Sequence, residues 1–283
     1  MTALLIAAAL VFSEADARLA HATARELVEQ CTPRDGGTAG SARAAAFIAA
    51  ASGKSGVAAK TERFLSKSPL GELPFVNVTA ELPRGGAEDG WTVLVSHFDT
   101  KCGTDCPGAN DGAATSGLLV ALAGVIARDA AVKRNVIFLW TDGEECVRRY
   151  AQDDGLHGSR RAAAALAASG RRIDAVIVAD MLGDEDLSIT IPVNSSPALR
   201  RLALAAAADI GEPDLVKPSL SAVTDDHVPF AERGFPAIDL IDFEYGPKNA
   251  YWHTSVDTMA HVSEKSLLKS GRLLAAMLER RWR

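Results

Sequence analysis

Short apolar runs alternate with longer amphipathic stretches along most of the chain. Four runs are nearly continuous in apolar residues, which predicts strands covered on both faces of a sheet: 92–96, 135–140, 175–179 and 237–241. Two further strands are predicted at 57–64 and 75–82, separated by a turn-rich stretch at 66–74.

Helical patterns fill the intervals between these strands. The predicted helices span 18–30, 41–51, 113–128, 158–169, 197–210, 226–233 and 263–278. This alternation predicts an α/β fold, a three-layer sandwich whose mixed, mostly parallel central sheet is flanked by helices. No Pro/Gly-rich linker divides the pattern, so we expect a single domain over residues 18–283.

The first residues match a short export signal. An apolar run at 2–12 is followed by Ala15-Asp16-Ala17, a triplet typical of a cleavage site. The pattern predicts removal of residues 1–17 and a periplasmic or secreted protein. No Lys or Arg precedes the run, and the alternative is a helix that docks on the domain of a cytoplasmic protein. The run is too short to span a bilayer, and no other stretch approaches transmembrane length.

Composition and charge narrow the function classes. The 283 residues are 48% hydrophobic and carry a net charge of -6 without a basic block, which argues against a nucleic-acid partner. Cys102 and Cys106 lie four apart in a polar loop, where they could form a disulfide in an exported protein. Cys146 is typical of a small buried residue. No feature indicates an oligomeric state.

Polar side chains collect where the predicted strands end. In open α/β sheets, sites form at the carboxyl ends of the strands, so side chains that follow different strands converge there. The candidates follow a strand or lie in the glycine-rich loop 107–112: His97, Asp111, Glu144, Glu145, Asp180 and His253.

Imidazoles and carboxylates in one place indicate a metal site. Together they suit zinc, and crowded carboxylates repel each other strongly without a cation. Glu144 and Glu145 are neighbours that point in different directions, so one can bind metal while the other serves as a general base or acid. A single His or Asp at a strand end is more often structural. The joint pattern is what predicts the site.

These segments resemble a known superfamily. The run Ser96-His97-Phe98-Asp99-Thr100 and the loop at 108–113 are similar to the zinc aminopeptidases of the bacterial leucyl aminopeptidase type, as are Glu144-Glu145, Asp180-Met181 and Trp252-His253-Thr254. Animal-type glutaminyl-peptide cyclotransferases share that zinc-exopeptidase fold. The motifs occur in family order from about residue 38 to the C-terminus.

Several features are closer to the glutaminyl cyclase branch. A long insertion at 146–157 follows the glutamate pair, whereas the aminopeptidases have a much shorter link. Tyr150 stands where the cyclases carry a tryptophan that lines the substrate pocket. The segment at 225–230 and Trp252 before His253 are also similar to the cyclases.

The resemblance implies two ligand sets. A cyclase would hold one zinc with Asp111, Glu145 and His253, whereas an aminopeptidase would hold two zincs bridged by Asp111, adding His97 and Asp180. All five residues are present, so the ligands alone leave the number of zinc ions open.

The resemblance also implies an activity on peptide or protein N-termini. A cyclase would convert N-terminal glutamine to pyroglutamate with release of ammonia. Glu144 would transfer the proton, Asp180 and Asp225 would form an acidic hydrogen-bond network, and Tyr150 and Trp252 would wall the pocket. The alternative is a metallo-aminopeptidase that hydrolyses the N-terminal peptide bond. A remote alternative is a non-catalytic binding module, although such relatives have lost ligands that this chain retains.

Supporting residues are predicted with less specific roles. Asp99 and Asp257 are expected to orient neighbouring groups. Asp226 could cap the helix that follows it. His227 and His261 are expected to be structural or exposed.

Overall fold

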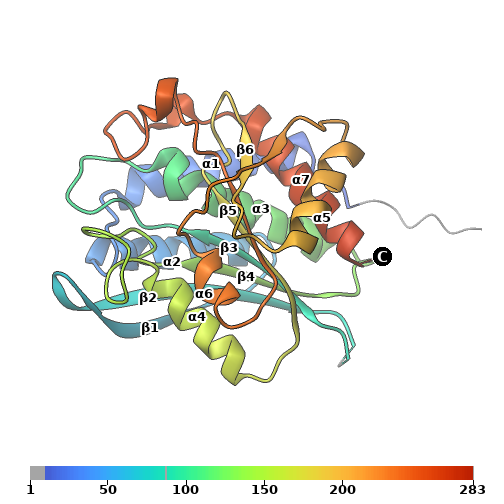
Figure 1. Ribbon diagram of the computed structural model, residues 1–283, viewed down its shortest axis with the longest axis horizontal. Helices are drawn as coiled ribbons and strands as arrows, with labels where there is room; N and C mark the ends of the chain where they lie inside the picture. Colours follow the sequence, from blue (N-terminus) through green and yellow to red (C-terminus); the bar gives the residue numbers. More distant parts are fainter. Residues whose placement is uncertain (1–9, 87, 283) are drawn as a thin grey trace, which may run out of the picture.

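An eight-stranded sheet forms the centre of the molecule, in the order β1-β2-β4-β3-β5-β8-β6-β7 (Figure 1). The computed structural model describes residues 10–86 and 88–282. The strands are β1 Ala59–Ser68, β2 Gly71–Pro83, β3 Trp91–His97, β4 Asn135–Thr141, β5 Ile173–Asp180, β6 Ile189–Ile191, β7 Val216–Pro218 and β8 Ala237–Ile241. The longer helices are α1 Glu14–Cys31, α2 Ala39–Lys54, α3 Thr115–Arg128, α4 His157–Ala168, α5 Pro197–Asp209, α6 His227–Ala231 and α7 Glu264–Trp282. Short helical turns are η1 Ala109–Ala114, η2 Pro247–Asn249 and η3 Met259–His261.

The sheet is mixed, as predicted. β4, β3, β5 and β8 run parallel to one another, β2 is antiparallel to β1 and β4, and β6 is antiparallel to β8. The predicted strands and helices are all present, with boundaries that shift by a few residues. β6 and β7 were not predicted, because each has 3 residues and leaves almost no periodic pattern.

The stretch predicted as turn-rich is mostly strand. β1 and β2 pair from Ser68↔Gly71 onwards, which leaves only residues 69–70 as the loop. Pro74 is tolerated because β2 pairs with β4 only from Val78, so at Pro74 one side of the strand has no ladder to complete.

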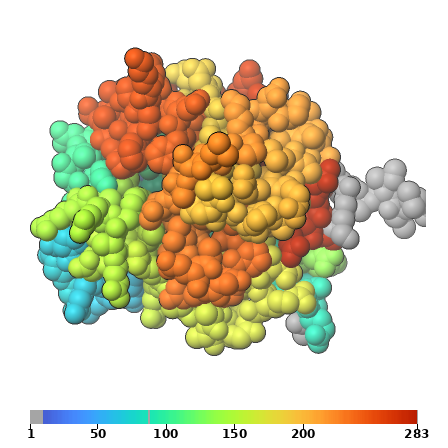
Figure 2. All heavy atoms as spheres, in the orientation of Figure 1, coloured from blue at the N-terminus to red at the C-terminus, as the bar shows by residue number. Residues whose placement is uncertain are grey.

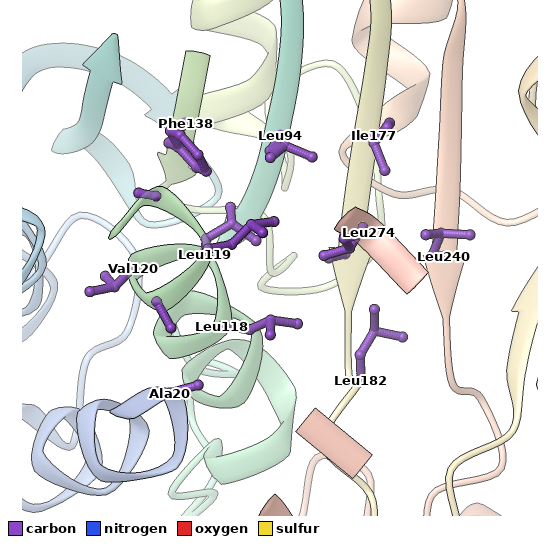
Figure 3. Close-up of a cluster of buried hydrophobic side chains, with 14 of the residues drawn as sticks. Ala20, Leu94, Leu118, Leu119, Val120, Phe138, Ile177, Leu182, Leu240 and Leu274 are labelled. Atoms are coloured by element: carbon purple, nitrogen blue, oxygen red, sulfur yellow. The ribbon is translucent and has the colours of Figure 1, made fainter. Parts of the chain in front are cut away.

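Helices cover both faces of the sheet, which makes the three-layer sandwich. α1, α2, α3, α5 and α7 lie on one face, and α4 and α6 lie on the other (Figure 1). The larger core lies under α3, where Leu118 and Leu119 meet side chains of the central strands such as Leu94 and Ile177 (Figure 3). Among the described residues, Ala109–Arg128 is the one helical stretch with the length and hydropathy of a membrane span, and its complete burial is that of a core helix.

The described part of the predicted signal packs on the domain. Phe12 is buried against Gly271 of α7, and Ser13 caps α1, because its Oγ accepts from the Asp16 backbone and the Asp16 carboxylate accepts from the Ser13 backbone. The triplet at residues 15–17 lies in the first turn of α1. Residues 1–9 lie outside the described residues, and export stays a prediction.

Gly117 sets the distance between α1 and α3. A Cβ at this position would lie 2.3 Å from the backbone oxygen of Ala20 in α1. We expect Gly117→Ala to lower the free energy of unfolding by about 1–3 kcal/mol, the usual cost of overpacking, measured by denaturant unfolding. Gly53→Ala is the matched control, because it lies in α2 with no atom within 4 Å of a new Cβ. Equal losses in both variants would contradict this account of the helix contact.

Candidate metal centre and active site

The predicted site residues meet where the strand order reverses. The chain runs from β3 outward to β4 on one side and to β5 on the other, which is the switch point at which open α/β sheets form sites. His97 is the last residue of β3 and Asp180 the last of β5. Glu144 and Glu145 follow β4, so three adjacent strands deliver side chains to one edge.

Asp111, Glu145 and His253 form the first ligand cluster. The His253 Nε2 lies 2.8 Å from Glu145 Oε1 and 3.4 Å from Asp111 Oδ2. One ligand atom from each residue lies within 4.8 Å of the others. These three residues match the set that was predicted for a single zinc.

His97, Asp111 and Asp180 form a second cluster that shares Asp111. The His97 Nε2 lies 3.1 Å from Asp111 Oδ1 and 3.1 Å from Asp180 Oδ1. Asp111 thus directs one oxygen to each cluster. Asp111 therefore lies between the two clusters, and the number of zinc ions that they would hold stays a prediction.

The electrostatics of both clusters fit a cation. Burial raises the pKa of Glu145, and the charge of Asp111 raises it further. Burial alone would lower the pKa of His253, but hydrogen bonds to Asp111 and Glu145 raise it to about 9. The protonated imidazoles of His97 and His253 therefore place positive charge among the carboxylates. A zinc ion bonded to one nitrogen and two carboxylate oxygens would supply that charge, and the donor set is one that zinc prefers.

Two buried carboxylates hold the backbone of the ligand loops, as predicted for them. Asp99 accepts hydrogen bonds from the backbone N–H groups of Glu144 and Glu145, both at 3.1 Å. Asp257 accepts from the backbone N–H groups of Asn110 and Asp111, at 2.8 and 3.2 Å. Each anion fixes the direction in which a ligand side chain leaves the main chain.

Arg34 is a supporting residue that the sequence did not reveal. Its buried guanidinium donates to the carbonyl oxygens of Phe98 at 2.5 Å, Pro107 at 2.6 Å and Gly108. It therefore joins the loop that carries Asp99 to the loop that carries Asp111. In the sequence it is one arginine in a turn-like segment, and no pattern separates it from a surface residue.

Lys101 also went unnoticed in the sequence. Its Nζ lies 3.3 Å from Glu145 Oε2 and donates to the Cys146 carbonyl at 2.6 Å. The ammonium places a positive charge beside the first ligand cluster.

The thiols of Cys102, Cys106 and Cys146 are all free of disulfide bonds.

Gly112 permits the close approach of the ligand loop to β3. Its φ is +95°, and a Cβ there would lie 3.1 Å from both the Asp99 carbonyl oxygen and the His97 ring. Only glycine adopts this conformation at low cost, so the turn just after Asp111 depends on it.

A cavity of about 310 Å³ opens onto the first cluster. All three of its ligands line the cavity, whereas His97 lies beneath it with 2% of its surface exposed. The segments that form the walls, the loop after β4 and the chain around 222–225 and 252–253, gather on the face shown in Figure 2. The remaining lining residues are Glu144, Tyr150, Asp180, Ala222, Val223, Thr224, Asp225, Ile241, Phe243 and Trp252.

Aromatic side chains form two walls of the cavity. Trp252 stacks on the His253 ring at 3.9 Å and meets Phe243 edge-on at 5.3 Å between ring centroids. Tyr150 is 36% exposed, yet its hydroxyl reaches inward and donates to Glu144 Oε1 at 2.8 Å. Both predicted wall residues therefore lie at the cavity, and Tyr150 also contacts the free glutamate.

Glu144 faces the cavity in a strongly acidic setting. Burial raises its pKa well above the usual range, and the charges of Asp225 and Glu145 raise it further. Burial likewise raises the pKa of Asp225, with the charges of Asp239 and Asp180 adding to the effect. A glutamate with a raised pKa is suited to accept a proton and return it near neutral pH.

One prediction about the supporting residues needs correction. The Asp226 side chain makes no capping bond to α6; it accepts from Thr141 Oγ1 at 2.5 Å instead, because it is buried against the end of β4. His227 is completely buried, which excludes the exposed alternative and agrees with the structural one. His261 lies against the Tyr251 ring and Glu185, in agreement with a structural role.

A larger groove of about 520 Å³ lies between β1, β2, β4 and α4. Its charged side chains form surface ion pairs, such as Arg161 with Glu62 and Arg171 with Glu81. None of the clusters of metal-ligating side chains found among residues 10–86 and 88–282 lies there. The chemistry therefore belongs to the smaller cavity.

Known proteins are similar to this chain in fold and in sequence. The chain is 31% identical to a glutaminyl cyclase from an Acidobacteriales bacterium, over 99% of this chain and 97% of that one, with a TM-score of 0.87. It is 31% identical to a glutaminyl-peptide cyclotransferase-like protein of Mus musculus over 76% of this chain. That match covers 63% of the mouse protein, so the chain spans less than two thirds of this relative. A Zn-dependent exopeptidase from Parabacteroides distasonis shares the fold, at 21% identity over 92% of this chain and 96% of that one, with a TM-score of 0.79.

The fold is a three-layer α/β sandwich of the zinc-exopeptidase-like type. The chain belongs to Peptidase family M28, which its residues 77–278 match. The family resemblance recognised in the sequence is confirmed.

The ligand role of His253 can be tested by metal content. We expect His253→Ala to lower bound zinc sharply, because the variant leaves Asp111 and Glu145 without their nitrogen partner. His261→Ala is the matched control, since this histidine lies outside the three metal-ligating clusters of the described residues. Mass-spectrometric metal analysis of both purified variants gives the readout. Unchanged zinc in His253→Ala would remove it from the ligand set.

Proposed function

We propose that the protein is a zinc-dependent glutaminyl-peptide cyclotransferase. It would convert the N-terminal glutamine of peptides or proteins to pyroglutamate and release ammonia. The observation that carries the proposal is the pairing of Tyr150 with Glu144 at 2.8 Å beside the Asp111, Glu145 and His253 cluster. The likeness to a glutaminyl cyclase at 31% identity over nearly the whole chain supports it.

The cavity suits a reaction within one residue. The attacking amine and the leaving amide nitrogen both belong to the glutamine, so a small pocket can hold every reacting atom. The glutamine methylenes would pack against Trp252 and Phe243, whose rings form one wall of the cavity. Zinc held by Asp111, Glu145 and His253 would supply a Lewis acid for the side-chain carbonyl.

Glu144 would carry the proton between the two nitrogen atoms. The α-amine nitrogen forms a bond to the side-chain carbonyl carbon, and the bond from that carbon to the amide nitrogen breaks. Glu144 accepts a proton from the amine and donates it to the departing nitrogen, which leaves as ammonia. The Tyr150 hydroxyl holds one oxygen of Glu144, so the other is directed to the substrate. Asp180 and Asp225 line the same cavity and would accept hydrogen bonds from the substrate amine.

A metallo-aminopeptidase is the second candidate. The observation that favours it is the second cluster, in which His97 and Asp180 complete a two-metal arrangement around Asp111. In that reaction Glu144 would take a proton from water during hydrolysis of the N-terminal peptide bond. The peptide substrate is common to both reactions.

Two fluorogenic substrates distinguish the candidates. A glutaminyl substrate coupled to pyroglutamyl peptidase reports cyclisation, and a leucyl substrate reports hydrolysis. The proposal predicts cyclisation, together with about one zinc at the Asp111 cluster. Release of the fluorophore from the leucyl substrate without cyclisation would make the protein an aminopeptidase.

Glu144→Gln tests the proton carrier. The amide cannot take up a proton, so we expect kcat to fall by roughly 10²–10⁴ while zinc stays bound, because Glu145 is unchanged. Glu185→Gln is the control, since this glutamate is exposed and pairs with His261. Near-normal kcat in Glu144→Gln would show that the proton moves through another group.

A further inference from the structure

A third cluster of ligating side chains lies behind the cavity. It consists of Asp225, His227 and Asp239, and this set is called the rear cluster below. Asp239 is the middle residue of β8, and His227 begins α6 on the face of the sheet that α4 also covers. One ligand atom from each of the three residues lies within 4.8 Å of the others.

The polar side-chain atoms of His227 and Asp239 lack partners, whereas Asp225 Oδ1 accepts from the Asp226 backbone N–H. His227 and Asp239 are both 0% exposed, and Asp225 is 4% exposed. Both ring nitrogens of His227 and both carboxylate oxygens of Asp239 are buried without a hydrogen bond. The Nδ1 of His227 lies 3.9 Å from Asp239 Oδ2, which is too far for a hydrogen bond between them.

These buried nitrogen and oxygen atoms need a polar partner or a counter-charge between them. Buried polar atoms in folded proteins are almost always paired, and a buried carboxylate without a counter-charge is strongly unfavourable. Burial among apolar residues of β8 and α6 prevents water from solvating Asp239 freely. Burial raises the pKa of Asp239 well above its usual range, and the negative charges of Asp180 and Asp226 raise it further.

The geometry matches what a metal ion needs. A neutral imidazole offers one lone-pair nitrogen whichever tautomer it adopts, and each aspartate offers an oxygen. In a tetrahedral zinc site the ligand atoms lie roughly 3.4 Å apart, close to the 3.9 Å between His227 and Asp239. Small side-chain rotations would close the remaining gap.

We propose that Asp225, His227 and Asp239 bind a divalent transition-metal ion, separate from the ion at Asp111. One imidazole and two carboxylates are a donor set for zinc and its first-row neighbours. Asp225 also lines the cavity, so the ion would enter and leave the site through the cavity. Asp225 would be its outermost ligand. The bound ion would keep Asp225 ionised and fixed, as an acceptor for the substrate amine. This site does not depend on which reaction the cavity performs.

Anomalous diffraction tests the rear site directly. Crystals of the full chain, loaded with zinc and then washed free of excess, would be measured above and below the zinc absorption edge. We expect an anomalous peak between Asp225, His227 and Asp239 in addition to one at the Asp111 cluster. A peak at the Asp111 cluster alone would overturn the rear site and leave the proposed function standing. A peak at the rear cluster alone would support the rear site and contradict the zinc site at the Asp111 cluster on which the proposed function depends.

Two matched variants provide a second readout in solution. Asp239→Asn removes a charge with little change in volume, and we expect it to lose about one metal ion per chain. Asp184→Asn is the control, because Asp184 is equally buried and has an unpartnered oxygen but lies outside the three clusters. Equal metal content in both variants and the unchanged protein would refute the proposal. Should Asp239→Asn fail to fold, the wild-type anomalous map still decides the question.

Discussion

Repulsion among buried carboxylates is the constraint on which this structure depends. Strands β3, β4 and β5 end side by side and bring Asp111, Glu144, Glu145 and Asp180 to one buried edge. Like charges at such distances in a low-dielectric interior destabilise the folded chain unless positive charge lies among them. His97 and His253 fill the two gaps around Asp111, and Lys101 lies beside Glu145. A bound cation would compensate the carboxylate charges more completely. The need for positive charge at this edge therefore connects the fold to its chemistry.

The surrounding protein prevents the charged groups from moving apart. Asp99 and Asp257 accept backbone N–H groups of the ligand loops, and Arg34 ties those loops together through their carbonyl oxygens. The loops are therefore fixed by their main chain rather than by the ligands alone. A site held in this way stays near its bound geometry before any ion or substrate arrives. The single glutamate left free, Glu144, is then aimed at the cavity by Tyr150.

Much of this arrangement could be predicted from the sequence. The buried strands leave continuous apolar runs, and the residues after them converge because parallel strands end at a common edge, as His97 and Asp180 do. The contacts that could not be predicted join residues far apart in the sequence and leave no local pattern. Arg34 donates to the carbonyl oxygen of Pro107, 73 positions away in the sequence. His227 and Asp239 come near each other only once α6 packs on β8. β6 and β7 were missed because strands of 3 residues are ordered by the strands beside them and carry almost no pattern of their own.

The cation requirement is tested most directly by zinc titration of chelator-treated protein at pH 7. His253, with its pKa raised to about 9, is protonated at that pH without metal and must lose the proton to become a ligand. The account predicts tight binding with release of a proton, seen by calorimetry in buffers of different ionisation enthalpy. It also predicts a rise of roughly ten degrees in the unfolding midpoint at saturating zinc. Zinc that binds without proton release, or that leaves the midpoint unchanged, would contradict the claim that these buried carboxylates and imidazoles are arranged around a metal ion.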